Sequence, residues 1–185
     1  LCINHRLTIE NAKVGEHIRP ASRLSFACIK HGPKPRLIQT KSQLDKIIEY
    51  VNNGLIDVGI LVYYNDQVTM IRDYFVSKGI PVQWKTHDYM DIDFKSTSPK
   101  IITWHCAKGL QFNDVFIPCC GLNEFRNYVY WNIEPMTEKE SALYVATTRP
   151  LENLYLLYTD NLAPRLPAPD SHIYAGNETD ANGPF

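Results

Sequence analysis

The residues best suited to chemistry lie in one short segment, Thr103–Phe112, which reads TWHCAKGLQF. It brings together a hydroxyl, an imidazole and an ammonium group, on Thr103, His105 and Lys108, and all three commonly bind phosphate. Gly109 permits a sharp backbone turn or the close approach of a ligand. The segment is therefore either a phosphate-binding loop or an ordinary polar loop between two strands.

Two further segments carry arginines. In Leu143–Pro150, Arg149 ends an otherwise apolar helix, because Pro150 disfavours helical backbone at the residue before it. A guanidinium there can offer two parallel hydrogen bonds to a phosphate, or it can merely compensate the negative end of the helix dipole. The third segment, Asn4-His5-Arg6 near the start of the chain, indicates nothing when taken alone.

Alternating strands and helices must position these segments. Short apolar runs rich in β-branched residues predict strands at 36–39, 57–62, 82–84, 100–104, 114–118 and 153–159. Because helices separate several of them, we expect an α/β fold, a mostly parallel sheet with helices on both faces. Ligands in such folds bind at the carboxyl ends of strands, which here are the loops after Trp104, Pro118 and Thr159.

Capping residues mark where the helices begin. Asn65 or Asp66 is expected to cap the helix that follows the strand at 57–62. The inner side of that helix is predicted to consist of Met70, Ile71, Tyr74 and Phe75. Thr137–Glu140 has the pattern of a capping box, in which a Thr hydroxyl and a Glu carboxylate satisfy each other's backbone N–H groups. It predicts the start of the helix that leads to Arg149.

Composition indicates a globular domain. The chain has 185 residues, of which 44% are hydrophobic and 21% are charged, enough to form a core without disulfides or metal. Its formal net charge of -1 excludes a strongly basic domain that holds nucleic acid by bulk charge, although a local patch remains compatible with it. The chain begins with Leu1 rather than Met, so we expect it to be part of a longer polypeptide.

Cysteine usage and apolar runs predict the compartment. Five cysteines at scattered spacings do not suggest a disulfide framework, so we expect a reducing environment and a cytoplasmic location. The apolar runs are far shorter than the ~20 residues that span a bilayer, and no signal peptide is visible. We therefore expect no membrane partner.

The last 26 residues differ in composition from the rest. Four of the twelve prolines fall in 160–185, among Asn, Asp and Gly residues. We predict a tail over 160–185, docked by Leu162, Leu166 and Ile173, after a domain over 1–159.

Taken together, the three polar segments resemble the UvrD/Rep-type DNA helicases of superfamily 1. The second RecA-like motor domain of that family carries an Asn-Tyr-Arg segment, then Thr-x-His-x-x-Lys-Gly-Leu-Glu-Phe, then Tyr-Val-Ala-x-Thr-Arg. The matching residues here are Asn4–Arg6, Thr103–Phe112 and Tyr144–Arg149, in the same order. Ile60–Asn65 and Lys78–Pro81 are similar to two intervening segments. The resemblance covers residues 1–159 and implies a RecA-like, P-loop NTPase-like fold.

The resemblance implies a role for each matching residue. Arg6 and Arg149 would be arginine fingers that reach the γ-phosphate of ATP held on a neighbouring motor domain. Gln111 stands where the family has a Glu that contacts the nucleotide sugar, and His5 stands where a Tyr stacks on the base. Gly109 would belong to the same nucleotide site.

The resemblance also implies single-stranded DNA as a partner. Thr103, His105 and Lys108 would contact its phosphates without reading sequence, and movement would be 3′ to 5′. Trp131, in an aromatic-rich loop, is our candidate for stacking on a base, with simple packing as the alternative.

The sequence departs from the family pattern at several further points. Tyr64 replaces the family's Arg, and only Val82–Ile102 is available where the family has a large inserted domain. The chain also has no GxxxxGK[ST] phosphate loop and no magnesium-binding acidic segment. ATP and its Mg²⁺ would therefore be held by a first motor domain, expected in the same polypeptide, and this segment alone should be inactive.

Two metal-binding interpretations are weak. The His and Cys residues form no paired C-x-x-C arrangement, which argues against zinc. Asp88, Asp91 and Asp93 alternate as in a calcium loop but lack its Gly and its terminal Glu. We therefore predict no metal site in this chain.

Two alternatives to the motor hypothesis stay open. One is a non-catalytic, helicase-like domain that binds DNA or protein, which His5, Tyr64 and Gln111 keep open. The other is an unrelated nucleotide-binding α/β domain.

Overall fold

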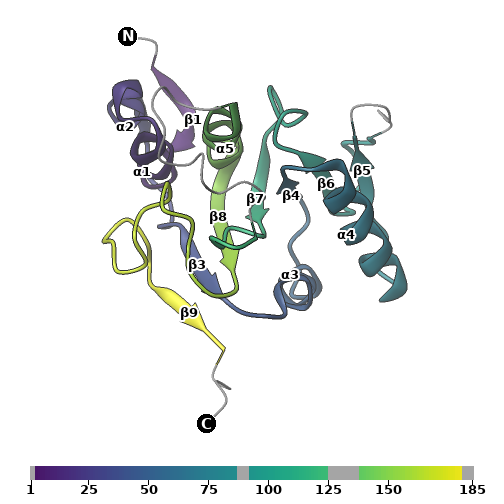
Figure 1. Cartoon of the computed structure of the whole chain (residues 1–185). Coiled ribbons are helices and arrows are strands. Elements are labelled where there is room, and N and C mark those ends of the chain that lie inside the picture. The colour runs from purple at the N-terminus through teal and green to yellow at the C-terminus, as the bar shows by residue number, and fades with distance from the viewer. Residues whose placement is uncertain (1–2, 87–91, 125–137, 181–185) are drawn as a thin grey trace.

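A seven-stranded parallel sheet forms the centre of the computed structural model, which describes residues 3–86, 92–124 and 138–180. The strands lie in the order β5-β6-β4-β7-β8-β3-β9, and every neighbouring pair is parallel (Figure 1). Their bounds are β3 Arg36–Gln39, β4 Val58–Val62, β5 Gln83–Lys85, β6 Lys100–Thr103, β7 Phe112–Ile117, β8 Pro150–Tyr158 and β9 Asn177–Thr179. The predicted α/β fold with a parallel sheet is confirmed.

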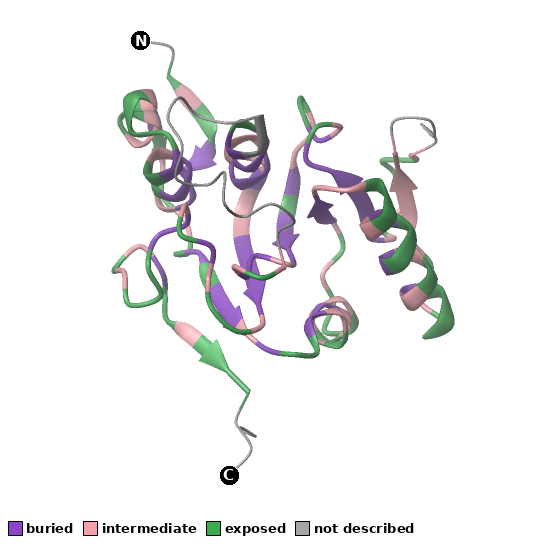
Figure 2. Ribbon diagram, in the orientation of Figure 1, coloured by how far each residue is buried: buried purple, intermediate pink, exposed green. Residues whose placement is uncertain are grey.

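Helices cover both faces of this sheet. The helices are α1 Ile9–Ile18, α2 Leu24–Ala27, α3 Gln43–Asn52, α4 Asn65–Ser77 and α5 Glu138–Thr147, with a 3₁₀ turn at Pro20–Ser22. Successive strand residues point to opposite faces, so Leu61 packs in the core beneath α1 and α5 while Ile60 packs in the core beneath α3 and α4. Burial on both sides explains why the strands are continuous apolar runs (Figure 2).

Helix α4 differs from its prediction in two respects. Asn65 is its first residue rather than its cap, and the backbone N–H groups of Tyr63 and Tyr64 donate to Oε1 of Gln67 over 3.2 and 2.9 Å. The side chain of Gln67 thus reaches back one turn to the N–H groups of the N-cap residue, Tyr64, and of the residue before it. Met70 was predicted to lie inside but is 51% exposed.

The inner stripe of α4 consists of Val68, Ile71 and Phe75 instead. They follow one another at three- and four-residue spacing, which leaves Met70 a third of a turn away from the stripe. At the end of α4, Lys78 is the C-cap, and Gly79 follows with φ of +74°.

Strand β8 begins earlier than predicted, at Pro150, where the backbone of Phe112 pairs with it. Proline is tolerated as the first residue of a strand because its missing N–H costs no ladder bond there. Helix α5 ends at Thr147, so only Thr148 and Arg149 separate it from β8. The predicted helix end before Pro150 is confirmed, while Thr137 lies outside the described residues.

A small N-terminal unit, residues 4–30, stands beside the main sheet. Strand β1, Asn4–Thr8, pairs in parallel with β2, Cys28–Lys30, in a separate two-stranded sheet, with α1 and α2 between them. Helix α1 begins where the hydroxyl of Thr8 accepts from the backbone N–H of Asn11 over 3.2 Å. This unit carries His5 and Arg6.

The segment after Asp160 docks on the domain. Leu166 and Tyr174 are buried in the core beneath α1 and α5, and Leu162 and Ile173 pack against it, as predicted. Residues 177–179 also add the edge strand β9 beside β3, which the sequence did not predict. The boundary between 159 and 160 stays a prediction.

None of the described helices is long and apolar enough to cross a membrane.

Candidate functional site

Arg6 and Gln111 lie side by side although 105 positions separate them. Nη1 of Arg6 donates to Oε1 of Gln111 over 3.2 Å. The side-chain carbonyl of Asn4 accepts from the backbone N–H groups of Arg6 and Leu7, at 3.0 and 3.1 Å, which fixes the chain around the arginine. The first of the three polar segments therefore meets the second.

Arg149 contacts the same turn through Leu110. Its guanidinium donates to the carbonyl oxygens of Val145 at 2.9 Å and Leu110 at 3.4 Å, and to the Thr148 hydroxyl at 2.9 Å. All three acceptors are uncharged, and no carboxylate among the described residues pairs with it. Burial lowers the pKa of Arg149 because it disfavours the charged form. This cation lacks an anionic partner within the described part of the chain.

The turn Gly109–Gln111 connects the two arginines. Gly109 has φ of +85°, a conformation that suits glycine, and an added Cβ would meet nothing within 4 Å. The predicted backbone turn at Gly109 is therefore confirmed. After the turn, the backbone N–H of Phe112 donates to the carbonyl of Arg149 over 3.2 Å.

This arrangement places the cluster at the amino ends of strands. Gln111 directly precedes β7, and Arg149 directly precedes β8. Both residues thus lie away from the carboxyl ends of strands, where ligands are expected in such folds. For Gln111 the reason is topological. Strands β6 and β7 run in the same direction, so the connection between them, which contains no helix, must return from the carboxyl end of β6 to the amino end of β7.

His5 and Arg6 also line an open pocket of about 410 Å³ on the N-terminal unit. Its other lining residues include Ile3, Leu24 and Ala27. Apolar walls beside an imidazole and a guanidinium can accommodate a planar aromatic group.

The expected DNA-contacting residues differ in their exposure to solvent. His105 and Lys108 are exposed after the carboxyl end of β6. Thr103 is only 4% exposed, and its hydroxyl accepts from the backbone N–H of Cys106 over 3.4 Å. The side chain of Thr103 thus stabilises the turn and offers little surface to a ligand. Trp131 lies outside the described residues.

Aromatic rings accompany His105. The centroid of the Tyr63 ring lies 5.3 Å from the ring centroid of His105, 4.7 Å from that of Tyr64 and 5.3 Å from that of Trp104. Trp104 is buried, whereas the two tyrosines are half-buried at the end of β4. The sequence did not indicate this cluster, because Tyr63 and His105 follow different strands, β4 and β6.

The predicted loops after Pro118 and Thr159 line a second pocket, of about 320 Å³. Its floor is a hydrogen-bonded carboxylate: Glu124 accepts from Gln43 at 2.6 Å and from the hydroxyl of Thr159 at 2.9 Å. Its lining contains two carboxylates, Asp45 and Glu124, against one lysine, Lys41, which does not favour phosphate.

Metal and thiol chemistry find little support in the described residues. They contain no group of three His, Cys, Asp or Glu side chains that could hold a metal ion. The four described cysteines, Cys28, Cys106, Cys119 and Cys120, are free thiols. Burial raises the pKa of Cys119 to about 12 and that of Cys120 well above its usual value, so neither offers a thiolate.

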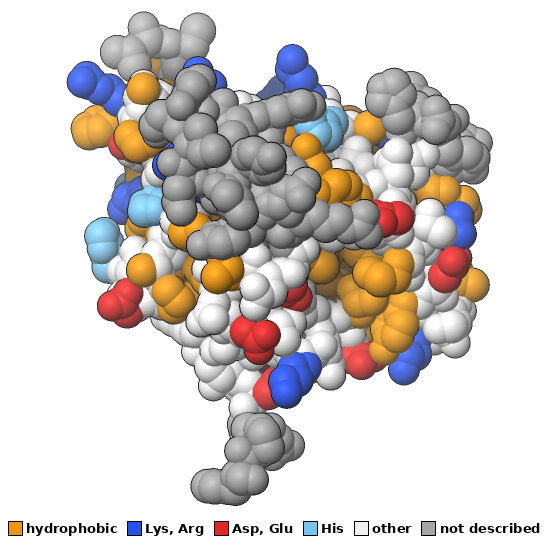
Figure 3. All heavy atoms as spheres, in the orientation of Figure 1, with side chains coloured by type: hydrophobic (Ala, Val, Ile, Leu, Met, Phe, Trp, Pro, Cys, Tyr) orange, Lys and Arg blue, Asp and Glu red, His pale blue; other side chains and the backbone are white. Residues whose placement is uncertain are grey.

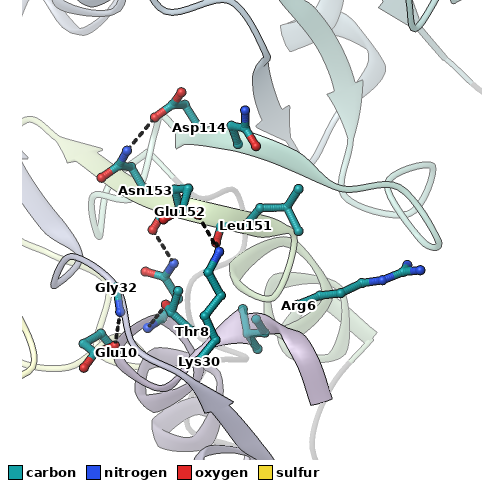
Figure 4. A network of polar contacts seen from close by, with 12 residues as sticks. Arg6, Thr8, Glu10, Lys30, Gly32, Asp114, Leu151, Glu152 and Asn153 are labelled. Atoms are coloured by element: carbon teal, nitrogen blue, oxygen red, sulfur yellow. Dashed lines mark hydrogen bonds and ion pairs between the residues drawn. The ribbon is translucent and has the colours of Figure 1, made fainter.

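Sequence reasoning missed the contacts that attach the N-terminal unit to the sheet (Figure 4). Asn11 and Lys30 bond the backbone of β8 directly after Arg149-Pro150. No sequence signal links them to β8, because more than a hundred positions intervene.

The surface agrees with the balanced charge. On the face shown in Figure 3, the coloured Lys and Arg side chains are interspersed with acidic and apolar ones and form no continuous basic surface. Phosphate contacts on this face would therefore be few and local.

Comparisons with known proteins point to one family. Residues 84–161 match the family model of the UvrD-like helicase C-terminal domain. The fold is similar to the crystal structure of the C-terminal domain of a possible DNA helicase from Lactobacillus plantarum WCFS1, with a TM-score of 0.66 and 14% sequence identity. That match covers 95% of this chain and 98% of the other. No curated protein matches the chain.

The family match includes two of the three polar segments, Thr103–Phe112 and Tyr144–Arg149. The fold match extends over nearly the whole chain, including most of the N-terminal unit. Residues 84–161 thus carry the sequence pattern of a UvrD-like helicase C-terminal domain, and the fold of the chain is similar to that of the C-terminal domain of a possible DNA helicase.

Proposed function

We propose that this chain is the C-terminal motor domain of an ATP-dependent DNA helicase or translocase. The observation that carries the proposal is the meeting of Arg6, Gln111 and Arg149 around one turn. They come from three separate segments of the sequence, and core packing does not require two arginines to bond adjacent residues of one turn.

The two arginines would act on ATP bound to a first motor domain in the same polypeptide. Arg149 has no carboxylate partner among the described residues, so a γ-phosphate oxygen would supply its missing anion. As negative charge spreads over the phosphoryl oxygens in the transition state, both guanidinium groups stabilise it. Mg²⁺, held by the first motor domain, would neutralise further phosphate charge.

The remaining nucleotide contacts follow from the same geometry. The amide of Gln111 can bond a sugar hydroxyl, and the pocket beside His5 has apolar walls for the base. Gly109 keeps Gln111 beside Arg6. ATP is thus the substrate whose binding site these residues would complete.

Single-stranded DNA would bind at the carboxyl end of β6. His105 and Lys108 are exposed there for phosphate contacts, and the ring of Tyr63 beside His105 suggests a stacking surface. Thr103 would act through the turn that it stabilises, and Trp131 stays a candidate for stacking. We propose 3′ to 5′ movement and a cytoplasmic location, the latter supported by the free cysteines.

The second candidate is a non-catalytic, helicase-like domain that binds DNA or protein. It is favoured by the hydrogen bond between Arg6 and an uncharged Gln111, which occupies one N–H group of a proposed finger without any nucleotide.

Two measurements on the full-length protein separate these candidates. The motor hypothesis expects ATP hydrolysis that single-stranded DNA stimulates, and unwinding of a duplex with a 3′ tail but not of one with a 5′ tail. DNA binding without stimulated hydrolysis would refute the motor and support the non-catalytic domain. Unwinding from a 5′ tail would contradict only the direction.

A further inference from the structure

The position of Arg6 relative to Arg149 is not set by the main sheet. Arg6 lies in β1, which pairs with β2 in a separate two-stranded sheet, whereas Arg149 directly precedes β8 of the seven-stranded sheet. Something other than a shared strand ladder must therefore fix the distance between the two guanidinium groups.

A bulge in β8 provides the attachment point. Phe112 pairs with Pro150 and Asp114 pairs with Asn153, so one residue of β7 lies opposite two residues of β8, Leu151 and Glu152. Such an extra residue leaves the ladder locally disrupted. Strand β3 joins β8 only from Tyr155 onward, so the backbone at the bulge is available to other donors.

The N-terminal unit occupies this place with two side chains. Nζ of Lys30 donates to the carbonyl of Leu151 at 2.9 Å and to the carboxylate of Glu152 at 2.5 Å. Nδ2 of Asn11, a fully buried residue, donates to the backbone carbonyl of Glu152 at 2.8 Å. In Figure 4, Lys30 reaches up to β8, while the side chain of Arg6 extends away from this network.

The residue before Arg149, Thr148, also lies against the N-terminal unit. Gly15 of α1 lies so close to α5 that an added Cβ would be 3.1 Å from Cγ2 of Thr148. The residues before and after Arg149-Pro150 thus both touch the unit that carries Arg6. A hydrogen bond also attaches the segment just after the unit to α1: the backbone N–H of Gly32 donates to the carboxylate of Glu10 at 2.8 Å.

We propose that Lys30 and Asn11 are positioning residues that hold Arg6 and Arg149 in one fixed arrangement. They touch neither arginine. By anchoring β1 and α1 to the β8 bulge, they determine where Arg6 stands when Arg149 meets a phosphate. The inference rests on the proposed function for its catalytic consequence, whereas the anchoring itself can be measured without turnover.

The first test is hydrogen exchange on the full-length protein. Lys30→Met should accelerate exchange of the β1 amides by about tenfold and leave the amides of β4 unchanged. Lys30→Arg retains a charge and donors and should restore protection. Lys46→Met is the matched control, because Lys46 also pairs with two carboxylates, Glu49 and Glu178, but on α3. Unchanged β1 exchange in Lys30→Met would overturn the proposal.

The second test separates positioning from general destabilisation. Lys30→Met should lower the kcat of DNA-stimulated ATP hydrolysis by about 10- to 100-fold, since a misplacement of about 1 Å in catalytic groups can cost about 10²-fold, with little change in KM. In an Arg6→Ala background the same substitution should have no further effect on kcat. An equal loss in both backgrounds would show a merely structural role and refute positioning.

Asn11→Ala provides a second variant of the anchor. The anchoring and the proposed function can be refuted separately. This substitution should produce the same β1-specific increase in exchange. If β1 is anchored as expected but the wild-type protein shows no DNA-stimulated hydrolysis, the proposed function is wrong and the anchoring stands. If hydrolysis occurs and neither variant changes β1 exchange, the anchoring is wrong and the proposed function stands.

Discussion

Arg6 donates a hydrogen bond to Gln111 over 3.2 Å, and through it the first strand of the N-terminal unit meets the turn before β7. The next residue back, Leu110, accepts from Arg149 at 3.4 Å. One short turn thus joins two cations from distant parts of the chain. Under the proposed function, a nucleotide phosphate is the anion that both guanidinium groups would bind.

The conformation of Gly109 should matter for activity beyond its effect on stability. Gly109→Ala places a Cβ on a backbone with φ of +85°, which costs about 1 kcal/mol in free energy of unfolding. It should also displace Leu110 and Gln111 and lower DNA-stimulated kcat in the full-length protein.

The matched control for Gly109 is Gly79→Ala. Gly79 has φ of +74° and, like Gly109, open space around its Cβ position, but it lies at the end of α4. The control should therefore show a similar loss of stability in urea unfolding with unchanged kcat. Equal kcat in the two variants would contradict a role for the Gly109 turn in the site.

Lys108 should contribute one phosphate contact to DNA binding. Lys108→Ala should weaken binding of single-stranded DNA by a similar factor for all sequences, because phosphate contacts read no bases. The slope of log K against log salt should fall by about 1. The control Lys34→Ala removes another exposed lysine, from the loop between β2 and β3, and should leave the slope unchanged. An unchanged slope in Lys108→Ala would exclude this contact.

Asp114 should make stability depend on pH. Burial raises its pKa above 3.8, although the amide of Asn153 donates to the carboxylate at 2.8 Å and partly offsets this. At pH above both the folded and unfolded pKa values, the charged carboxylate therefore destabilises the fold. As pH falls from the raised pKa towards 3.8, the folded chain takes up the proton first and this cost disappears.

The variant Asp114→Asn removes that titration and can still accept from Asn153. It should be more stable than the wild-type chain at neutral pH, and the advantage should shrink as pH falls through the same window. Urea unfolding at a series of pH values measures both quantities. A difference that does not change with pH would show that Asp114 is not the titrating group.

The sequence predicted the strands of the main sheet well, because burial on both faces demands uninterrupted apolar runs such as Val58–Val62. It did not predict β9, since Asn177–Thr179 is a polar edge strand that owes its conformation to pairing with β3. The N-terminal unit was also missed, although Thr8 as a cap and Val14 with Ile18 at helical spacing gave a usable signal.

For the candidate site, the residue types could be predicted and their arrangement could not. The motifs predicted Arg6, Gln111 and Arg149 as site residues. Their contacts with one turn, however, depend on where the connection from β6 to β7 ends. The bond from Lys30 to Leu151 spans 121 positions, and no local pattern encodes such a contact. Thr103 shows the reverse case: the sequence predicted a DNA contact for it, whereas in the structure its hydroxyl accepts a hydrogen bond within the turn after β6.

The most direct test of the account compares Arg6→Ala and Arg149→Ala with wild type in the full-length protein, measuring DNA-stimulated kcat and the Kd for ATP in parallel. Arg36→Ala, which removes an exposed arginine of β3, is the control. Arginine fingers are worth about 10³-fold or more in kcat, so both variants should lose hydrolysis at this scale while ATP binding and the control stay near wild type. Unchanged kcat in either finger variant would contradict the account.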